Sequence, residues 1–264
     1  MHELERQKLI LSAVQERPVA TVAELVALTN ASEATIRRDI AALHLAKQLR
    51  RVRGGAEALL PPTQSPLAGR PFSVNQGLHI AEKRAIARKA AELCTDGDAV
   101  IINGGTSTYQ MVHLLTQKRL QIFTNSFPIA EHLLQHSKNQ LTLPGGTIYR
   151  EQNIILSPFE NDVSNSFCAS RMFMGAHSVG RLGLMESDPL VIQSEQKLLG
   201  QADELVVLAD ASKFNRRSPL LICSLNRIDV LITDDRIDDA SVTMLENADV
   251  EVIIADVNSV EKTA

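Results

Sequence analysis

The sequence contains few aromatic residues and few cysteines. It has no Trp, two Tyr and seven Phe, so aromatic residues make up 3% of its 264 residues. Proteins that bind single-stranded nucleic acid stack bases on aromatic rings, so this composition argues against such a function. The three cysteines, Cys94, Cys168 and Cys223, form no C-x-x-C pair. An odd number of scattered cysteines indicates reduced thiols rather than a disulfide framework.

Long apolar runs are also absent. No stretch approaches the roughly 18 consecutive apolar residues of a membrane-spanning helix. The first six residues, Met1 to Arg6, have neither the basic start nor the apolar segment of a secretory signal. We therefore expect a cytoplasmic protein without membrane contact. Apolar residues make up 44% of the chain and charged residues 22%, which is ordinary usage for a folded protein with a substantial core.

Positive charge is concentrated near the N-terminus. The whole chain carries a net charge of −4, but residues 1–60 contain nine Lys or Arg against seven Asp or Glu. Between residues 37 and 53, Asp39 is the one acidic residue. The basic residues of this segment are Arg37, Arg38, Lys47, Arg50, Arg51 and Arg53. Such a cluster is typical of either a solvated face or a surface that binds a polyanion.

The first 45 residues predict three helices. Apolar residues repeat at helical spacing between residues 9 and 14, and Pro18 ends this first helix. Thr21 and Glu24 form a capping box at the start of the second helix. After a short polar break, Ser32 is placed to cap a third helix. Three short helices in this span are typical of a helix-turn-helix domain.

The third predicted helix has an apolar face and a polar face. Ile36, Ile40 and Leu43 share the apolar face, which must point inward. The opposite side near the helix N-terminus then presents polar and small residues, as a recognition helix does in a major groove. These residues are Glu33, Ala34, Thr35, Arg37 and Arg38.

A basic β-hairpin is predicted after this helix. Residues 49–53 alternate as a strand does, Gly54 and Gly55 suit a turn, and residues 56–60 return. The result is a two-stranded wing that carries Arg50, Arg51 and Arg53.

These segments together resemble the winged helix-turn-helix signature of DeoR-type repressors. The resemblance covers Ser-Glu-Ala-Thr-Ile-Arg-Arg-Asp-Ile at 32–40 and Arg-Arg-Val-Arg-Gly-Gly-Ala at 50–56. Lys47 departs from the pattern, because the family usually has a glycine near this position. The resemblance implies that residues 1–60 bind double-stranded operator DNA through the recognition helix and the wing. The residues expected to do so are Ser32, Glu33, Thr35, Arg37, Arg38, Arg50, Arg51 and Arg53.

An interdomain linker is predicted at 61–79, because this segment is rich in Pro and Gly. Residues 80–264 then alternate between helical and strand patterns, which predicts an α/β domain with a largely parallel sheet. The expected helices include 82–94, 108–115 and 190–201. The expected strands are 99–103, 120–124, 140–143, 171–174, 205–209, 230–233 and 250–255.

Glycine and polar residues follow several of these strands, where ligands of parallel sheets bind. The first strand leads into a run whose backbone N–H groups and hydroxyls could hold a phosphate, although the same run can be a simple turn before a capped helix. This run is Asn103, Gly104, Gly105, Thr106, Ser107 and Thr108. The ends of later strands contribute Thr124, Asn125, Gly145, Gly146, Asp210 and Lys213. Lys213 would supply a fixed positive charge for an anion.

The order of these elements also resembles the effector domain of DeoR-type repressors, which is similar in fold to ribose-5-phosphate isomerase. The resemblance includes Asp-Ala-Ser-Lys-Phe at 210–214 and Glu-Gln-Lys at 195–197, which adds Glu195 to the expected site. It implies a phosphorylated sugar or polyol as effector. Residues 156–158 and 190–199 look closest to repressors of ascorbate utilisation. Residues 175–178 replace the catalytic aspartates of the isomerases, which argues against catalysis.

Two functions remain open at this point. The first is a ligand-controlled repressor of a carbohydrate catabolic operon, with no enzymatic activity. The alternative is a sugar-phosphate isomerase-like enzyme with an accessory DNA-binding module. A repressor with one small DNA-binding domain per chain is expected to form a homo-oligomer, a dimer or tetramer, because two half-sites multiply affinity. We expect no cofactor and no metal, since His132 and His136 have no obvious third ligand.

Overall fold

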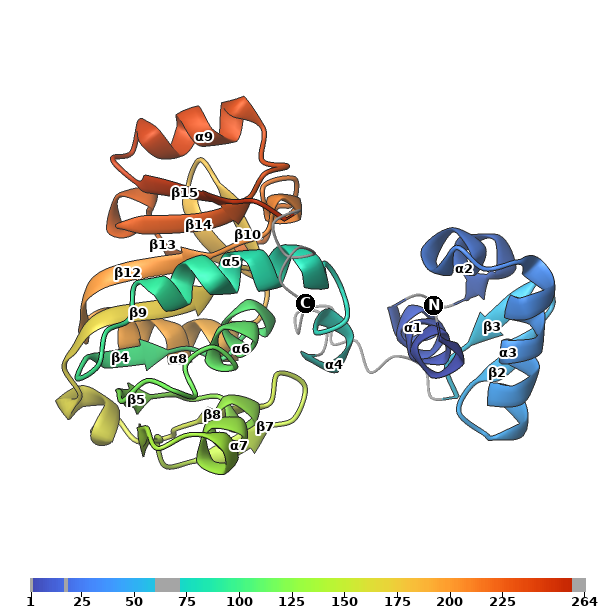
Figure 1. The fold of residues 1–264 in the computed structure, drawn as a ribbon, viewed down its shortest axis with the longest axis horizontal. Coiled ribbons are helices and arrows are strands. Elements are labelled where there is room, and N and C mark those ends of the chain that lie inside the picture. Colours follow the sequence, from blue (N-terminus) through green and yellow to red (C-terminus); the bar gives the residue numbers. More distant parts are fainter. Residues whose placement is uncertain (1, 17–18, 60–71, 258–264) are drawn as a thin grey trace. The chain divides into compact units, whose positions relative to one another are not determined.

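The chain divides into two units, residues 1–66 and 67–264, in a computed structural model (Figure 1). The structure describes residues 2–16, 19–59 and 72–257. Pro18, Leu60 and residues 61–71 of the predicted linker therefore lie outside the described residues. The rest of the predicted linker contains a short helix, α4 (Phe72–Asn75), which was not expected from the sequence.

The first unit is a three-helix domain with a small antiparallel sheet. Its helices are α1 (Glu3–Glu16), α2 (Val22–Thr29) and α3 (Glu33–Leu45). Its strands are β1 (Ala20–Thr21), β2 (Arg50–Val52) and β3 (Gly55–Glu57), in the order β1-β3-β2. The three predicted helices and the predicted wing, formed by β2 and β3, are confirmed. Strand β1 is an addition, because a two-residue strand leaves no period in the sequence.

The predicted helix caps are present in this unit. Thr21 and Glu24 form a capping box, in which the Thr21 N–H donates to Glu24 Oε2 at 2.9 Å and the Glu24 N–H donates to Thr21 Oγ1 at 3.3 Å. Ser32 Oγ accepts a hydrogen bond from the Thr35 N–H at 3.2 Å. The apolar faces of the helices meet in one core, in which Ile36 and Ile40 of α3 are buried.

Lys47 occupies a backbone conformation that suits glycine. Its φ is 54°, which is the left-handed region. The Lys47 N–H donates to the His44 carbonyl at 3.0 Å and the Gln48 N–H to the Leu43 carbonyl at 2.9 Å. This pair of bonds is the Schellman motif that ends many helices, usually with Gly at the left-handed residue. Lys47 therefore replaces the usual glycine, but the helix still ends in the same capping motif.

Replacing Lys47 by Gly is expected to stabilise the first unit by about 1 kcal/mol, because the left-handed conformation strains a side chain with a Cβ. Urea unfolding followed by circular dichroism would measure the gain. Lys47→Ala is the matched control, since it removes the same charge and keeps the Cβ. Equal stability of the Gly and Ala variants would contradict the strain argument.

The second unit contains a seven-stranded parallel sheet in the order β15-β14-β12-β9-β4-β5-β6. Every strand of this sheet was predicted from the sequence. The strands are β4 (Ala99–Ile102), β5 (Gln121–Phe123), β6 (Gln140–Thr142), β9 (Ala169–Gly175), β12 (Ala202–Leu208), β14 (Val230–Asp234) and β15 (Glu251–Ala255). The remaining helices are α5 (Ile80–Glu92), α6 (Thr106–Val112), α7 (Phe127–His136), α8 (Pro189–Leu199) and α9 (Asp239–Glu246). Helix α6 begins two residues before its predicted start.

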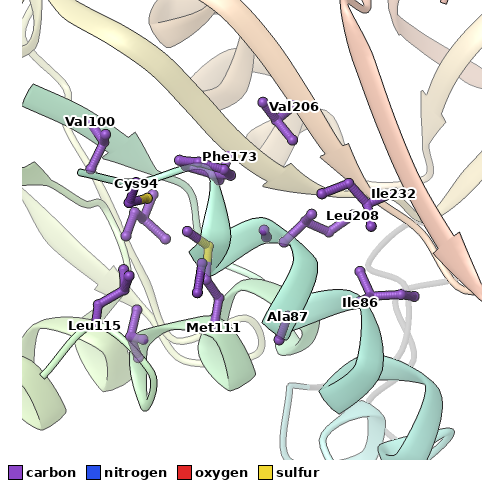
Figure 2. Close-up of a cluster of buried hydrophobic side chains, with 14 of the residues drawn as sticks. Ile86, Ala87, Cys94, Val100, Met111, Leu115, Phe173, Val206, Leu208 and Ile232 are labelled. Carbon is purple, nitrogen blue, oxygen red and sulfur yellow. The ribbon is translucent and has the colours of Figure 1, made fainter. Parts of the chain in front are cut away.

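Two apolar cores cover the faces of this sheet. Helices α5, α6 and α7 pack on one face, where Ile86, Met111 and Phe173 are buried together (Figure 2). Helices α8 and α9 contribute Leu198 and Leu245 to the core on the other face. Both faces are therefore apolar, which explains the continuous apolar runs that made the strands predictable.

Smaller sheets were not predicted. Strands β10 (Ser178–Gly180), β11 (Gly183–Glu186) and β13 (Leu220–Cys223) form an antiparallel sheet in the order β10-β11-β13. Strands β7 (Thr147–Tyr149) and β8 (Ile154–Leu156) form a hairpin. No helix among the described residues is long and apolar enough to cross a membrane.

The strand order creates a switch point between β4 and β9. From β4 the chain adds β5 and β6 on one side, and β9, β12, β14 and β15 on the other. Loops that leave adjacent strands in opposite directions open a crevice at the carboxyl ends of those strands. The loops after β4 and β9 are therefore the first place to look for a ligand pocket.

Candidate functional sites

The outward face of α3 carries the polar residues expected of a recognition helix. Arg37 and Arg38 are exposed, whereas Ile36 before them and Ile40 after them are buried. Arg37 Nη2 donates to Glu33 Oε2 at 3.2 Å, one helical turn earlier. An exposed pair of this kind contributes little to stability, so Arg37 can exchange this partner for a phosphate or a base at small cost.

Asp39 has a structural role in this helix. Its carboxylate accepts hydrogen bonds from Arg6 Nε at 2.5 Å and from Arg6 Nη2 at 3.2 Å. Because Asp39 is buried, this ion pair fastens α1 to the inner side of α3. The negative charge in the basic segment thus points away from solvent, and the outward surface is more basic than the sequence suggests.

Cationic side chains surround a shallow groove between α3 and the wing. Arg37 from α3 and Arg51 and Arg53 from the wing line it, together with the backbone of Gly54. Arg50 forms an ion pair with Glu57 across the hairpin. The structure thus places Arg37 of the predicted recognition helix and two of the three predicted wing arginines, Arg51 and Arg53, on one basic surface. Their contact with DNA remains a prediction.

The second unit contains a pocket at the switch point, with a volume of about 100 Å³. The loop after β4 lines it with Asn103, Gly104, Gly105, Thr106 and Ser107. Segments distant in sequence complete its wall. These include Phe72 and Asn75 of α4, Gln152, Ile154, Gly175, Ala176, His177, Glu186, Val191, Glu195, Lys213 and Arg216.

Side-chain hydrogen bonds hold the loop after β4 in place. The Gly104 N–H donates to Asn125 Oδ1 at 2.8 Å, and Asn125 Nδ2 donates to Ser194 Oγ of α8 at 3.0 Å. Thr108 donates its hydroxyl to the carbonyls of Asn103 and Gly105. A Cβ on Gly104 would lie 2.4 Å from Ile154 Cγ2, so this position requires glycine. Asn125 and Thr108 thus support the pocket wall.

A buried pair, from the loop after β4 and from α8, lines the same pocket. Asn103 is 1% exposed and Glu195 is 5% exposed, and Asn103 Nδ2 donates to Glu195 Oε1 at 2.9 Å. Burial raises the pKa of Glu195 well above its usual range, and the nearby carboxylates of Glu186 and Asp188 raise it further against the opposing effect of the Asn103 hydrogen bond.

A buried aspartate, Asp210, and Lys213 follow β12 beside the pocket, and a second lysine, Lys83, lies in α5. Burial raises the pKa of Asp210, but Lys213, the Ser212 hydroxyl and other cations outweigh it, so the net shift is downward. Lys83 of α5 donates from Nζ to the Asn75 carbonyl at 2.6 Å and to the Leu78 carbonyl. Burial lowers the pKa of Lys83 to about 8, with a further contribution from Lys213. This end of the pocket is therefore cationic.

Several predicted site residues do not line this pocket. Gly145 and Gly146 follow β6, which is two strands away from β4 in the sheet. A Cβ on Gly146 would lie 2.1 Å from the Leu156 carbonyl oxygen, so contact with β8 explains that glycine. Thr124 is buried and its hydroxyl accepts from the Ser126 N–H at 3.1 Å. A role for these residues with an effector remains a prediction.

Sequence reasoning omitted other residues of the pocket. His177 and Glu186 form a hydrogen-bonded pair at 3.0 Å, and Arg216 adds a second cation to Lys213. His177 belongs to residues 175–178, which were interpreted as a departure from the isomerases. Phe72 and Arg216 sit in segments without any motif. Only the tertiary structure brings these segments to the loop after β4.

A second cavity, beside Lys197, is separate from this pocket. Lys197, two residues after Glu195, donates to Asp162 Oδ2 at 2.8 Å in a larger cavity of about 710 Å³.

Among the described residues, no group of three or more His, Cys, Asp or Glu side chains is arranged to hold a metal ion. His132 instead packs against His113, with 3.0 Å between His113 Nδ1 and His132 Nε2.

Comparison with known proteins covers both units. Residues 6–60 match the family described as DeoR-like helix-turn-helix domain, and residues 78–235 match the DeoR C terminal sensor domain. The chain is 31% identical over 253 residues to the HTH-type transcriptional regulator UlaR of Shigella dysenteriae serotype 1, covering 96% of this chain and 99% of that protein. The UlaR proteins of several Escherichia coli strains match to the same extent.

Solved structures match part of the chain. Ribose 5-phosphate isomerase A from Methanocaldococcus jannaschii is 19% identical with a TM-score of 0.38, over 50% of this chain and 53% of that chain. The eIF2B beta protein from Chaetomium thermophilum is 13% identical with a TM-score of 0.40, over 60% of this chain and 49% of that chain. The chain thus spans about half the length of these structures.

Proposed function

The chain belongs to the DeoR family of helix-turn-helix transcriptional regulators, and on this basis we propose that it represses a carbohydrate catabolic operon under the control of a phosphorylated sugar or polyol. The first unit binds double-stranded operator DNA and the second unit binds the effector. The relatives named above are transcriptional regulators, and the alternative of an isomerase-like enzyme has no support among them.

One observation carries the assignment of the effector class: the glycine loop after β4 and the cations after β12 meet in the same pocket. Backbone N–H groups at the start of a helix have no partner within that helix. Thr106 and Ser107 at the start of α6 line the pocket opposite Lys213 and Arg216. Backbone donors and two cations suit a phosphate group, and the polar pair Asn103 and Glu195 suits sugar hydroxyls.

The charge of the protein makes these local groups necessary. The chain carries a net charge of −4, and residues 1–60 have more basic than acidic residues, so the rest of the chain is more negative still. A phosphate dianion is repelled by such a domain at long range. Lys213 and Arg216 must overcome that field within the pocket.

The wall of the pocket connects effector binding to a conformational change. Phe72 and Asn75 of α4 line the pocket. A sugar phosphate bound there would act on α4. Helix α4 is the part of the wall closest in sequence to the boundary between the two units, which lies after residue 66. Moving α4 would change how the DNA-binding unit is held, so the effector would favour one arrangement over the other.

Operator binding is proposed to require a homo-oligomer, a dimer or tetramer. One recognition helix and one wing contact few bases, and a second DNA-binding unit on an adjacent half-site multiplies affinity through effective concentration. A regulator that acts on operator DNA works where the chromosome is, so we place it in the cytoplasm.

The proposal is tested by measuring DNA binding with and without effector. Differential scanning fluorimetry against a panel of pentose, hexose and polyol phosphates identifies a ligand, because binding to the native state raises apparent stability. Fluorescence anisotropy with operator DNA, selected by the protein from random duplexes, then measures the response. We expect at least a tenfold change in operator affinity, a coupling of about 1.4 kcal/mol. Binding of the unphosphorylated sugars alone would refute the effector class.

A further inference from the structure

The pocket contains two buried polar atoms without hydrogen-bond partners. Asn103 Oδ1 and Glu195 Oε2 have none within the described part of the chain, although the other polar atoms of the two side chains bond to each other. Both residues are more than nine-tenths buried and both line the pocket. Buried polar atoms are nearly always paired, so these two lack partners that a ligand in the pocket can supply.

The groups around Glu195 determine its charge. The N-cap of α8 contributes Asp188 and β11 contributes Glu186, and both of these carboxylates disfavour a charge on Glu195 by raising its pKa. Cys223 of β13 also faces Glu195, and burial raises the pKa of that thiol to about 11, which keeps it neutral. His177, Lys213 and Arg216 line the same pocket. Of these groups, His177 is paired through Nδ1 with Glu186 Oε1 at 3.0 Å.

A charged Glu195 would be poorly solvated here. Its Oε1 accepts one hydrogen bond from a neutral amide, and its Oε2 would carry negative charge in a buried position without a donor. Burying an unpaired carboxylate is more costly than protonating it. Because Oε1 already accepts from Asn103, the proton belongs on Oε2.

We propose that Glu195 is protonated in the ligand-free pocket and that, together with Asn103, it binds a hydroxyl group of the effector. Glu195 Oε2–H donates to the hydroxyl oxygen, and Asn103 Oδ1 accepts the hydroxyl proton. A hydroxyl group both donates and accepts, so it satisfies both atoms, whereas a carboxylate on the ligand would satisfy only Glu195. The inference rests on the proposed function for the identity of the ligand, but the charge of Glu195 is testable without any ligand.

The first experiment measures stability against pH in the full chain. Both tyrosines, Tyr109 and Tyr149, lie in the second unit and the protein has no Trp, so tyrosine fluorescence in urea follows the unit that contains Glu195. A folded state that keeps a proton the unfolded state has lost becomes less stable as pH rises above the ordinary pKa of 4.5.

The expected result is a difference between wild type and Glu195→Gln. The Gln side chain at position 195 cannot titrate. Relative to this variant, the folding equilibrium constant of the wild type should fall by up to tenfold per pH unit above pH 4.5. The fall ends where Glu195 ionises in the folded protein. Glu131→Gln, at an exposed position of α7, is the matched control and should follow the wild type. Parallel profiles for wild type and Glu195→Gln would overturn a protonated Glu195.

The second experiment separates the hydroxyl group from the phosphate. Titration calorimetry uses ribose 5-phosphate, glucose 6-phosphate and sorbitol 6-phosphate as polyhydroxy probes and inorganic phosphate as the anion probe. Glu195→Met removes the donor and should weaken the sugar phosphate that binds by at least tenfold while leaving inorganic phosphate unchanged. Glu195→Gln restores a donor, and should restore most of the affinity.

The pH profile adds a readout that a merely structural role would not change. The quantity to follow is the ratio of the wild-type affinity for the sugar phosphate to its affinity for inorganic phosphate. This ratio should be constant at low pH and fall as Glu195 ionises. The same ratio should be independent of pH in Glu195→Gln. Equal weakening of both probes by Glu195→Met would overturn the hydroxyl assignment. Binding of inorganic phosphate without any sugar phosphate would also overturn it and leave the anion site standing, whereas binding of neither probe would refute the proposed function as well.

Discussion

The double substitution of Arg37 and Arg38 by Ala is expected to abolish the preference of the protein for its operator over random DNA. Both side chains are exposed on the outward face of α3, and their removal leaves the buried face of the helix intact. An arginine that binds a guanine contributes about 1–3 kcal/mol of discrimination, roughly a five- to 150-fold loss of specificity for each base-reading residue. The single variants would show which of the two reads bases.

Arg53→Ala is expected to behave differently, because a wing arginine that contacts phosphate carries no sequence information. Its loss should weaken operator and random DNA equally and lower the slope of log affinity against log salt by about one. Anisotropy titrations at several salt concentrations measure both effects. Arg181→Ala, which removes an exposed arginine between β10 and β11 in the other unit, is the matched control. Unchanged operator selectivity in the Arg37 and Arg38 double variant would show that α3 is not the recognition helix.

The sequence predicted elements well where burial imposes a strong period. Each strand of the parallel sheet was predicted, because both faces of that sheet are covered and strands such as β9 and β12 contain short apolar runs, at 172–174 and 205–208. The helix caps at Thr21 and Ser32 were predicted because a cap depends on residues three positions apart. Local rules suffice for these features.

The same rules fail for the short strands of the smaller sheets. The β7–β8 hairpin and the β10-β11-β13 sheet have strands of three or four residues, with Ser, Gly and Glu among apolar residues. No period can be detected in so few residues. Helix α4 was assigned to the linker because it follows a segment rich in Pro and Gly, and its four residues do not outweigh that composition.

The pocket shows where sequence reasoning stops. Residues after successive strands were expected to converge at one edge, and those after β4 and β12 do line one pocket. Gly145 and Gly146 do not line it, because they follow β6, which lies two strands away from β4 in the sheet. The position of a strand in the sheet cannot be deduced from its position in the chain. Asn103 and Glu195 are 92 positions apart in sequence, and only the packing of α8 on the sheet brings their side chains together.

Lys213→Met is expected to abolish the response to effector and to leave operator binding intact. Lys213 lines the pocket opposite the loop after β4, beside the buried Asp210. A hydrogen bond to a charged group contributes about 1.5–3 kcal/mol, so losing this contact to a phosphate should weaken the effector about ten- to 150-fold. Met fills most of the space of the Lys side chain, so the change removes the charge with little effect on packing.

Two measurements separate loss of binding from loss of folding. Titration calorimetry with the sugar phosphate identified by fluorimetry gives effector affinity, and anisotropy gives operator affinity without effector. Lys138→Met removes the same charge from an exposed position of the second unit and should respond as the wild type does. A ligand changes DNA affinity only through its different affinities for the two states of the protein, so a variant that cannot bind the phosphate cannot respond. If Lys213→Met responds normally, or if the unphosphorylated sugar binds as tightly as its phosphate, the effector binds elsewhere, and the larger cavity beside Lys197 becomes the next site to test.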